Sequence, residues 1–491
     1  MENFNLIDHP WIPVRWKSTS AENPPLVSLN DAFSRGEEIA DLDCLPHERI
    51  ALMRLLVCIT QSALEAPATP DDWNTFDTNL ASSIPAYLNQ ENIHPHFNLT
   101  GDGPRWLQTK PKNISPKDQK PLSKLSFHLA SGNNPTLLDH WGEATRPWQA
   151  SDAALLLLCL QNFFVGGSMA SAVKGNGPAL KALHLILQGD SLTQTILANC
   201  LDHHTIASTG QPLGKPVWEA PADQTLLSRL APRPCALWLS DDLTTVSIAQ
   251  GHQYLDFDAI REPSTTLRID PKKGDRYLLR ASPGRGVWRD LHLLTCLKVG
   301  EESTGDPSLV LKAYYEREEH LGSNIRFWVG ELIKANDAKI LNSTESSFTV
   351  ASTIFTPQGH LTYHAGIDFA DNISKKLYGA VKFFASQLGS EAAPTEAAQQ
   401  NYWHTLDHEH RQLIHLAEQA ENYPLPKAIG SEGATDLWTK TIQKAALAAY
   451  EAVCPRTTPR QIQAYAAGIK PLYRALYPSK QKTKPAAKAT K

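Results

Sequence analysis

The sequence predicts an α+β protein in which a large mixed N-terminal domain is followed by a C-terminal four-helix bundle. Three observations support this fold class. Short apolar runs separated by proline open the chain, residues 230–300 are rich in strand and turn patterns, and amphipathic helical patterns dominate from about residue 365. A chain of 491 residues is too long for one ordinary hydrophobic core. We therefore expect a mixed domain over 1–362, a bundle over 363–478 and a basic disordered tail over 479–491.

The N-terminal domain is expected to alternate strands with buried helices. Apolar residues around Trp11, punctuated by Pro10 and Pro13, are typical of strands and turns. Broad apolar stripes predict buried helices, and proline suits a first helical turn. The expected helices cover residues 50–59, 70–88 and 151–165 and begin again near 178, and the expected strands include 237–239, 244–248 and 277–279.

The C-terminal domain is expected to consist of four helices joined by short links. The predicted helices cover residues 364–388, 395–421, 436–453 and 459–477. Gly389, Pro424, Gly430 and Pro455 interrupt the helical pattern between them. Four amphipathic helices with short connections make a bundle.

Composition argues against a chain that grips DNA by itself. The net charge is −4 and the pI is near 6.5, whereas phosphate neutralisation makes most self-sufficient DNA binders basic. A subunit that touches DNA at a small site remains compatible with this charge. Two basic segments, 101–124 and 268–289, are either nucleic-acid contacts or ordinary solvated surface.

Cysteine spacing and hydropathy indicate a cytoplasmic protein. The seven cysteines are scattered singly, which disfavours both a disulfide framework and a cysteine zinc site. The N-terminus lacks the basic and apolar regions of a signal peptide. The most apolar run, 153–160, is far shorter than the roughly 20 residues of a membrane span, so we expect no membrane association.

Two histidine clusters raise the alternative of a metal-dependent nuclease or phosphohydrolase. One comprises His203 and His204, and the other comprises His404, His408 and His410. A catalytic metal site needs three or four convergent ligands, and neither cluster supplies a complete set in sequence. Polar helix faces are the preferred interpretation, so we expect no catalytic residue, no metal and no cofactor.

Glycine is most concentrated at Gly166-Gly167-Ser168 and at 175–177. These residues match neither a Walker motif nor the dinucleotide-binding pattern. Without a Cβ, glycine backbone can approach a partner closely. From the residues alone, a helix-to-helix loop and a binding loop are both open interpretations.

Seven segments spread along nearly the whole chain form a recognisable series. They are Leu6-Ile7-Asp8, Trp11-Ile12-Pro13-Val14, Leu55 to Ile59, Leu107 to Lys110, Ser131 to His140, the stretch 166–178, and Ala335 to Leu341. Each motif is moderately specific. Their order and spacing together resemble CasA, the large subunit of the type I-E CRISPR Cascade surveillance complex.

The resemblance implies a non-catalytic subunit that recognises the protospacer-adjacent motif (PAM) in double-stranded DNA. Such a subunit starts strand separation for R-loop formation and provides a docking surface for the helicase-nuclease in antiviral defence. The implied partners are the backbone, small and handle-binding Cascade subunits, the CRISPR RNA, the target duplex and the helicase-nuclease. A subunit that has kept only a structural role is a third hypothesis.

The resemblance also implies site residues. Gly166, Gly167 and Ser168 correspond to the glycine loop that meets the PAM, and Asn336, Asp337 and Ala338 correspond to the strand-separating wedge. His252 and Gln253 stand where some members carry a minor-groove lysine, and Asn133, Asn134 and Leu138 correspond to the RNA-handle loop.

Three of these positions depart from the family pattern. Asp337 replaces a glutamine, no lysine lies in 251–256, and Leu138 replaces a frequent aromatic residue. From its residues alone, Asn336-Asp337 also fits a helix cap or a turn.

Overall fold

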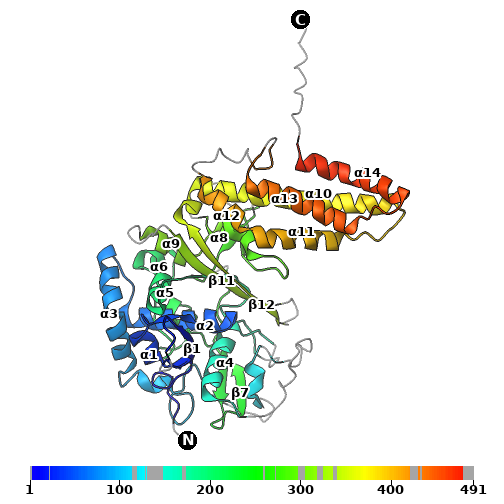
Figure 1. Ribbon diagram of the computed structural model, residues 1–491. Coiled ribbons are helices and arrows are strands. Elements are labelled where there is room, and N and C mark those ends of the chain that lie inside the picture. Colours follow the sequence, from blue (N-terminus) through cyan, green and yellow to red (C-terminus); the bar gives the residue numbers. More distant parts are fainter. Residues whose placement is uncertain are drawn as a thin grey trace. The chain divides into compact units, whose positions relative to one another are not determined.

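A computed structural model shows a chain of two compact units (Figure 1). The first comprises Met1–Val287 and Val299–Thr349, and the second comprises Trp288–Lys298 and Val350–Lys491. The second unit therefore begins before residue 363, where the sequence places the start of the bundle, and it includes a segment from the middle of the chain. The structure describes residues 3–20, 23–112, 119–127, 129, 147–167, 173–257, 260–270, 272–296, 305–317, 324–334, 340–420, 429–431 and 434–478.

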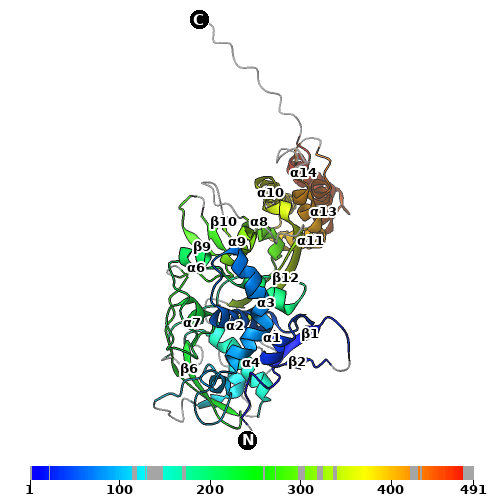
Figure 2. The same ribbon diagram turned by 90° about the vertical axis from the view of Figure 1, so that its left-hand side faces the viewer.

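The first unit is built around helix α2 (Pro46–Leu64), which is buried along most of its length. Pro46 lies in its first turn, and the Glu48 carboxylate accepts a hydrogen bond from the backbone of Leu45 at 2.9 Å. Helix α3 (Pro70–Leu88) packs against both α2 and the short helix α1 (Leu29–Ser34), and Figures 1 and 2 show these three helices. The helices predicted over 50–59 and 70–88 are confirmed.

The other helices of the first unit are α4 (Ala150–Phe163), α5 (Leu192–Asn199), α6 (His203–Ser208), α7 (Leu226–Leu230) and α9 (Leu309–Glu316). Short 3-10 turns cover His94–Phe97 and Leu122–Leu125. Helix α4 confirms the buried helix predicted over 151–165. The helix expected near 178 is wrong. Residues 178–182 form turns that lead into the buried strand β5 (His184–Leu187), because the amide of Ala179 donates to the carbonyl of Asn162 and that of Leu180 donates to the carbonyl of Gly177.

The strands of the described part form four three-stranded sheets. Their orders are β2-β1-β3, β10-β8-β9, β12-β11-β5 and β4-β7-β6. The bounds are β1 (Ile12–Trp16), β2 (Leu26–Val27), β3 (Ile39–Leu42), β4 (Gln119–Pro121), β6 (Cys235–Leu239), β7 (Thr245–Gln250), β8 (Leu267–Ile269), β9 (Arg276–Leu278), β10 (Gly305–Asp306), β11 (Asn324–Lys334) and β12 (Ile340–Ala351). The predicted strands 237–239, 244–248 and 277–279 correspond to β6, β7 and β9.

The second unit contains the helical bundle. Its long helices are α10 (Pro357–Gln387), α13 (Leu437–Val453) and α14 (Pro459–Leu476), while α11 (Thr395–Glu409) and α12 (Arg411–Glu418) follow one another directly. Helix α8 (Leu291–Leu294) and 3-10 turns at Val287–Asp290 and Ser352–Phe355 complete the described elements. The α+β class with a C-terminal helical region is confirmed.

The single helix predicted over 395–421 is interrupted at His410. The imidazole of His410 stacks on Trp288 with ring centroids 5.7 Å apart, and its Nδ1 lies 2.7 Å from the carbonyl oxygen of Asp407. The bonding of this side chain to its own helix end explains the break.

No helix in the described ranges has the length and apolarity that crossing a membrane requires.

Candidate nucleic-acid interface

The glycine loop begins directly where α4 ends. The Gly167 amide donates to the carbonyl of Val173 at 2.8 Å, and the Gly177 amide donates to the carbonyl of Phe164 at 2.8 Å. A Cβ at Gly166 would overlap the carbonyl oxygen of Gly175. The two sides of the loop are therefore held together backbone to backbone, at a separation that only glycine permits. Ser168 lies outside the described residues.

Gly167 is needed for its conformation rather than for space. Its φ is +78°, and a Cβ there would meet no atom within 4 Å. The residue is exposed. Its backbone takes a conformation that other residues adopt only with strain.

The segment that follows strand β7 lies against this loop. Gly175, also in the left-handed region at φ +90°, has Gln253 as its nearest neighbour: a Cβ at Gly175 would lie 3.8 Å from Cγ of Gln253. The amide of Lys174 donates to Oε1 of Gln250 at 2.7 Å. Two regions about 75 residues apart in sequence therefore meet on one surface, and both contain residues for which the sequence predicts a DNA contact.

His252 and Gln253 differ in their exposure to solvent. Gln253 is exposed, whereas His252 is half-buried, with its Nε2 2.9 Å from Nε2 of Gln224. Burial lowers the pKa of His252, and nearby Arg229 lowers it further while Asp223 opposes the shift. A neutral imidazole accepts from the Gln224 amide, so Gln253 is the side chain of this pair that faces solvent.

A buried ion triad underlies both regions. The Glu262 carboxylate binds Nη1 of Arg54 at 2.6 Å and Nη2 of Arg229 at 2.6 Å, and all three side chains are almost fully buried. Burial would raise the pKa of Glu262, but the two guanidinium groups outweigh it and hold this pKa below its usual value. Arg54 also donates to Oδ1 of Asn162 at the end of α4, and Arg229 donates to the carbonyl of Leu255. One carboxylate thus supports the base of the glycine loop and the segment opposite it.

His184 fixes the far end of the glycine loop. Its Nε2 lies 2.8 Å from the carbonyl oxygen of Ala179, and its Nδ1 lies 2.8 Å from the hydroxyl of Ser264. A carbonyl only accepts, so Nε2 carries the proton and Nδ1 accepts from the hydroxyl. Burial lowers the pKa of His184 to about 4, so the imidazole is neutral at pH 7.

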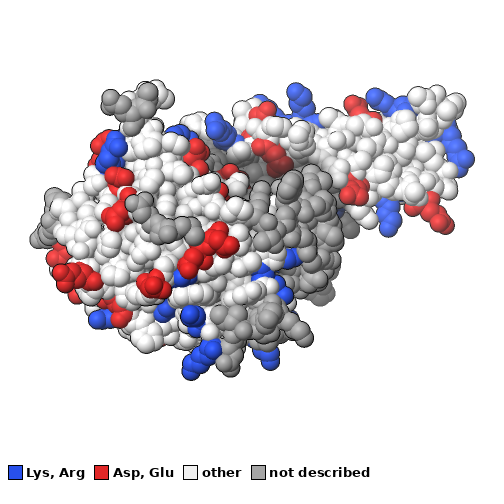
Figure 3. Space-filling model, turned by 90° about the horizontal axis from the view of Figure 1, so that it is seen from below, with Lys and Arg blue, Asp and Glu red and all other residues white. Residues whose placement is uncertain are grey.

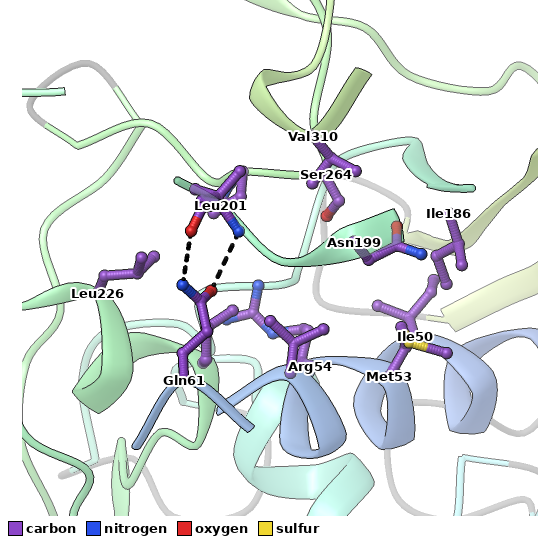
Figure 4. A pocket seen from close by; sticks show the side chains of 13 residues that line it. Ile50, Met53, Arg54, Gln61, Ile186, Asn199, Leu201, Leu226, Ser264 and Val310 are labelled. Carbon is purple, nitrogen blue, oxygen red and sulfur yellow. Dashed lines mark hydrogen bonds between the residues drawn. The ribbon is translucent and has the colours of Figure 1, made fainter. Parts of the chain in front are cut away.

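An apolar cavity lies beside the triad, and Figure 4 shows its lining. Ile50, Met53 and Arg54 of α2 face Ile186 and Val310 across it. Gln61 closes one side through two hydrogen bonds with the backbone of Leu201, at 2.9 and 3.3 Å. The cavity belongs to the packing of the core rather than to the surface site.

The two basic segments contain both structural and exposed cations. Arg105 is buried, bonds to Asp241 at 2.6 Å and lies over the ring of Trp238. Arg289 pairs with Asp371 at 2.7 Å. Lys110, Lys112, Arg268, Lys272, Lys273 and Arg276 are exposed. Among the described residues on the face in Figure 3, basic and acidic side chains are interspersed, so no field of one sign covers that face.

The histidine clusters do not form metal sites. His203 and His204 are exposed at the start of α6, where Asp202 caps the helix by accepting from the amide of Thr205 at 2.7 Å. His404 and His408 are exposed neighbours on α11, and His410 turns away to stack on Trp288. Within the described ranges, no group of three or more His, Cys, Asp or Glu side chains is arranged to hold a metal ion. This geometry gives the nuclease or phosphohydrolase alternative no support.

The remaining predicted site residues lie outside the described residues. These are the wedge residues Asn336, Asp337 and Ala338, and the RNA-handle residues Asn133, Asn134 and Leu138. The described chain on either side of the wedge belongs to β11, which ends at Lys334, and β12, which begins at Ile340. These two strands are neighbours in one sheet.

The family model of CRISPR-associated protein Cse1 matches residues 5–449 of this chain. The chain belongs to the CRISPR-associated protein Cse1 family. The CRISPR-associated protein CasA/Cse1 of Thermus thermophilus is 25% identical over 92% of this chain and 92% of that protein. The resemblance to CasA is therefore confirmed, and Cse1/CasA is the large subunit of a CRISPR surveillance complex.

Solved Cse1 structures share the fold. Thermus thermophilus CasA (Cse1) has a TM-score of 0.76 at 23% identity, covering 97% of this chain and 99% of that one. Cse1 from Acidimicrobium ferrooxidans has a TM-score of 0.76 at 17% identity, covering 97% and 98%. A chain of a CRISPR RNA-guided surveillance complex has a TM-score of 0.75 at 18% identity, covering 96% and 99%.

The buried residues that support the glycine loop and the 251–257 segment were not predicted from the sequence. Arg54, Glu262 and Arg229 come from three distant segments, and no local motif links them. One feature of the sequence could have indicated them. Arg54 is a charged residue inside the apolar stripe of α2, and such a residue needs a buried partner of opposite charge.

Proposed function

We propose that this Cse1 chain is the non-catalytic large subunit of a type I-E CRISPR surveillance complex that recognises the PAM in duplex DNA. It starts strand separation for R-loop formation and offers a docking surface to the helicase-nuclease. The observation that carries the proposal is the convergence of the glycine loop with the 251–257 segment on one surface. A chain of net charge −4 suits a subunit that inspects many sites briefly while partners hold most of the strand.

The geometry of this surface fits the minor groove. Gly167 and Gly175 present exposed backbone in the left-handed region, and Gln253 presents an amide that both donates and accepts hydrogen bonds. The minor groove offers a degenerate pattern of acceptors with one guanine donor. Reading by backbone and amide groups would therefore give tolerant recognition of a short motif.

The CRISPR RNA and the other Cascade subunits are the proposed partners. A similar fold occurs in a chain of a CRISPR RNA-guided surveillance complex, which supports this part of the proposal. Asn133, Asn134 and Leu138 are the residues proposed to meet the RNA handle. With leucine in place of an aromatic side chain, the contact to a base would be apolar rather than stacked.

The proposed wedge comprises Asn336, Asp337 and Ala338. Inserting a turn into the base stack costs a few kcal/mol in unstacking, which binding of the PAM must offset. An ionised Asp337 cannot donate a hydrogen bond and is repelled by phosphate, but it can accept from an exocyclic amino group of guanine or cytosine.

The proposed reading function is tested by a binding screen with the reconstituted complex. The probe is a pool of duplexes that match the guide and carry a randomised three-base flank. We expect the complex to enrich a subset of flanks, and we expect Gly167→Val to abolish the enrichment while binding to a complementary single strand is kept. Equal recovery of all flanks by the unaltered complex would refute motif reading.

The proposed wedge gives a separate prediction. Asp337→Ala is expected to weaken binding to a duplex target about tenfold more than binding to a target whose first bases are already unpaired, because only the duplex requires unstacking. Affinities for both targets are measured on the same complex. Equal losses on the two targets would rule out a strand-opening role.

A further inference from the structure

We infer that Gln224 and Gln250 are positioning residues that hold the two halves of the DNA-reading surface, each by using both ends of its side-chain amide. This inference rests on the proposed function, because it concerns how the same surface is kept in shape. In this role, neither glutamine contacts DNA itself.

Gln250 holds the glycine loop. Its Oε1 accepts from the amide of Lys174 at 2.7 Å, and its Nε2 donates to the carbonyl of Lys174 at 3.2 Å. The same Nε2 donates to the carbonyl of Gly251 at 3.2 Å. This side chain therefore satisfies both backbone groups of one loop residue, as a neighbouring strand would. Lys174 adjoins Gly175 and is fixed at the point where the loop meets the opposite segment.

Gln224 holds the opposite segment in the same manner. Its Oε1 accepts from the amide of Leu255 at 3.0 Å, and its Nε2 donates to the carbonyl of Gln253 at 2.9 Å. The Nε2 group also lies 2.9 Å from the ring nitrogen Nε2 of His252. Groups of His252, Gln253 and Leu255, around the exposed Gln253 side chain, thereby contact one amide.

Both glutamines are themselves anchored to rigid parts of the first unit. Gln250 is the last residue of β7 and pairs with Cys235 of β6. Oε1 of Gln224 lies 3.4 Å from Nη1 of Arg229, which belongs to the buried Glu262 triad. The described residues of the loop (166–167 and 173–177) and of the segment (251–257) form no helix or strand, so these two amides supply hydrogen bonds that a neighbouring strand would otherwise provide.

A primary amide is the side chain that this task requires. Each glutamine must donate at one end and accept at the other, which neither a carboxylate nor an ammonium group can do. Methionine has a similar length and no charge, and it loses both bonds. Glutamate keeps the acceptor and loses the donor, and it adds a negative charge.

The inference is tested in the reconstituted complex with Gln224→Met and Gln250→Met. The probes are the duplex pool with a randomised three-base flank and a single strand complementary to the guide. We expect each variant to reduce the enrichment of preferred over disfavoured flanks about tenfold, the factor that corresponds to about 1.4 kcal/mol of lost hydrogen bonding. Binding of the single strand is expected to stay unchanged.

Controls separate positioning from charge and from unfolding. Gln90→Met, in the exposed turn after α3, is the matched control and should behave as the unaltered chain. Gln224→Glu should lose flank preference as the methionine variant does, because the bond to the Gln253 carbonyl is lost in both. Thermal unfolding of each free chain shows whether it folds, and a variant that fails is replaced by Gln→Asn at the same position, which shortens the reach of the amide and carries the same expectation.

The outcomes distinguish this inference from the proposed function. If the unaltered complex shows flank preference and Gly167→Val loses it while both methionine variants keep it, the positioning role is wrong and the reading function stands. If the unaltered complex shows no flank preference at all, the proposed function fails, and the positioning role fails with it.

Discussion

At the scale of single residues, Glu262 has the largest expected effect on stability. Its carboxylate neutralises Arg54 and Arg229 in the interior, where the side chains of all three residues are almost fully buried. Removing one member of a buried ion network costs about 3–5 kcal/mol, because the remaining charges are left uncompensated. We expect Glu262→Gln to lower the free energy of unfolding by that amount, as measured by urea denaturation.

The control for Glu262 is an ion pair of the same chemistry at the surface. Glu38 binds Arg35 at 2.7 Å, with more than half of the Glu38 side chain exposed. Exposed pairs contribute little. Glu38→Gln should unfold at the same urea concentration as the unaltered chain, and equal destabilisation by the two variants would contradict the role assigned to the triad.

His184 makes the stability of the first unit depend on pH. The unfolded chain protonates this imidazole near pH 6.5, whereas burial holds its folded pKa at about 4. A depressed histidine pKa means that the unfolded state binds the proton first, so stability is full above pH 6.5 and is lost as the pH falls towards 4. The loss amounts to about 3 kcal/mol at 1.36 kcal/mol per pH unit.

A non-titrating variant tests this assignment. His184→Gln keeps a polar group that can bond Ala179 and Ser264 but cannot take up a proton in this range. The variant should be less stable at pH 7 and should lose less stability between pH 6.5 and 4 than the unaltered chain. Parallel stability curves for the two proteins would show that His184 is not the group that titrates.

At the scale of elements, the packing of α14 on α10 depends on Gly468. A Cβ at this position would lie 3.0 Å from the carbonyl oxygen of Ala380 in α10 and would overlap the hydroxyl of Tyr450. We expect Gly468→Ala to push the helices apart and to destabilise the helical unit by about 1–3 kcal/mol, as found for overpacked cores. Thermal unfolding followed by circular dichroism measures the change.

Gly379 on α10 provides a matched comparison. A Cβ there would meet no atom within 4 Å, and the residue lies inside a helix. Gly379→Ala should therefore stabilise the unit by about 0.5–1 kcal/mol, because alanine loses less backbone entropy. If both substitutions changed stability in the same direction, close packing at Gly468 would not be the cause.

The elements predictable from sequence are those whose signals are local. The Thr69–Asp72 pair bonds reciprocally at the start of α3, and Thr458 with Gln461 does the same at α14, so both helix starts follow from a few adjacent residues. The long strands β11 and β12 were not predicted, since β11 is buried on both faces and lacks the alternation that marks a half-exposed strand. The helix predicted to begin near residue 178 was wrong because proline suits turns as well as helix starts.

The same limit applies to the candidate site. The glycine loop and the 251–257 segment could be chosen by resemblance to CasA, but their contact could not, because the bonds between Lys174 and Gln250 join distant parts of the chain. Arg105 and Arg289 show the converse case. Both belong to segments that are basic in sequence, yet each forms a salt bridge with a carboxylate of its own unit.

At the scale of the whole molecule, charge limits what the chain can do alone. The net charge is −4, and Lys174 is the one exposed cation among the described residues of the glycine loop and the 251–257 segment. Non-specific binding to DNA depends on the number of phosphates neutralised, and each neutralised phosphate steepens the fall of affinity with salt. We expect the isolated chain to bind a guide-matched duplex no more tightly than about 10⁻⁶ M at physiological salt, while the assembled complex binds the same duplex at least about a hundredfold more tightly.

Fluorescence anisotropy of a labelled duplex, titrated between about 50 and 200 mM salt, measures both quantities. The free chain should show a shallow dependence of log affinity on log salt, because only a few Lys and Arg side chains reach phosphates. The assembled complex should show a steeper one, since its other subunits contribute most of the phosphate contacts. Nanomolar binding by the free chain with a steep salt dependence would mean that this Cse1 protein binds DNA tightly by itself. That result would contradict the proposal that the chain contacts DNA at a small site while its partner subunits hold most of the strand.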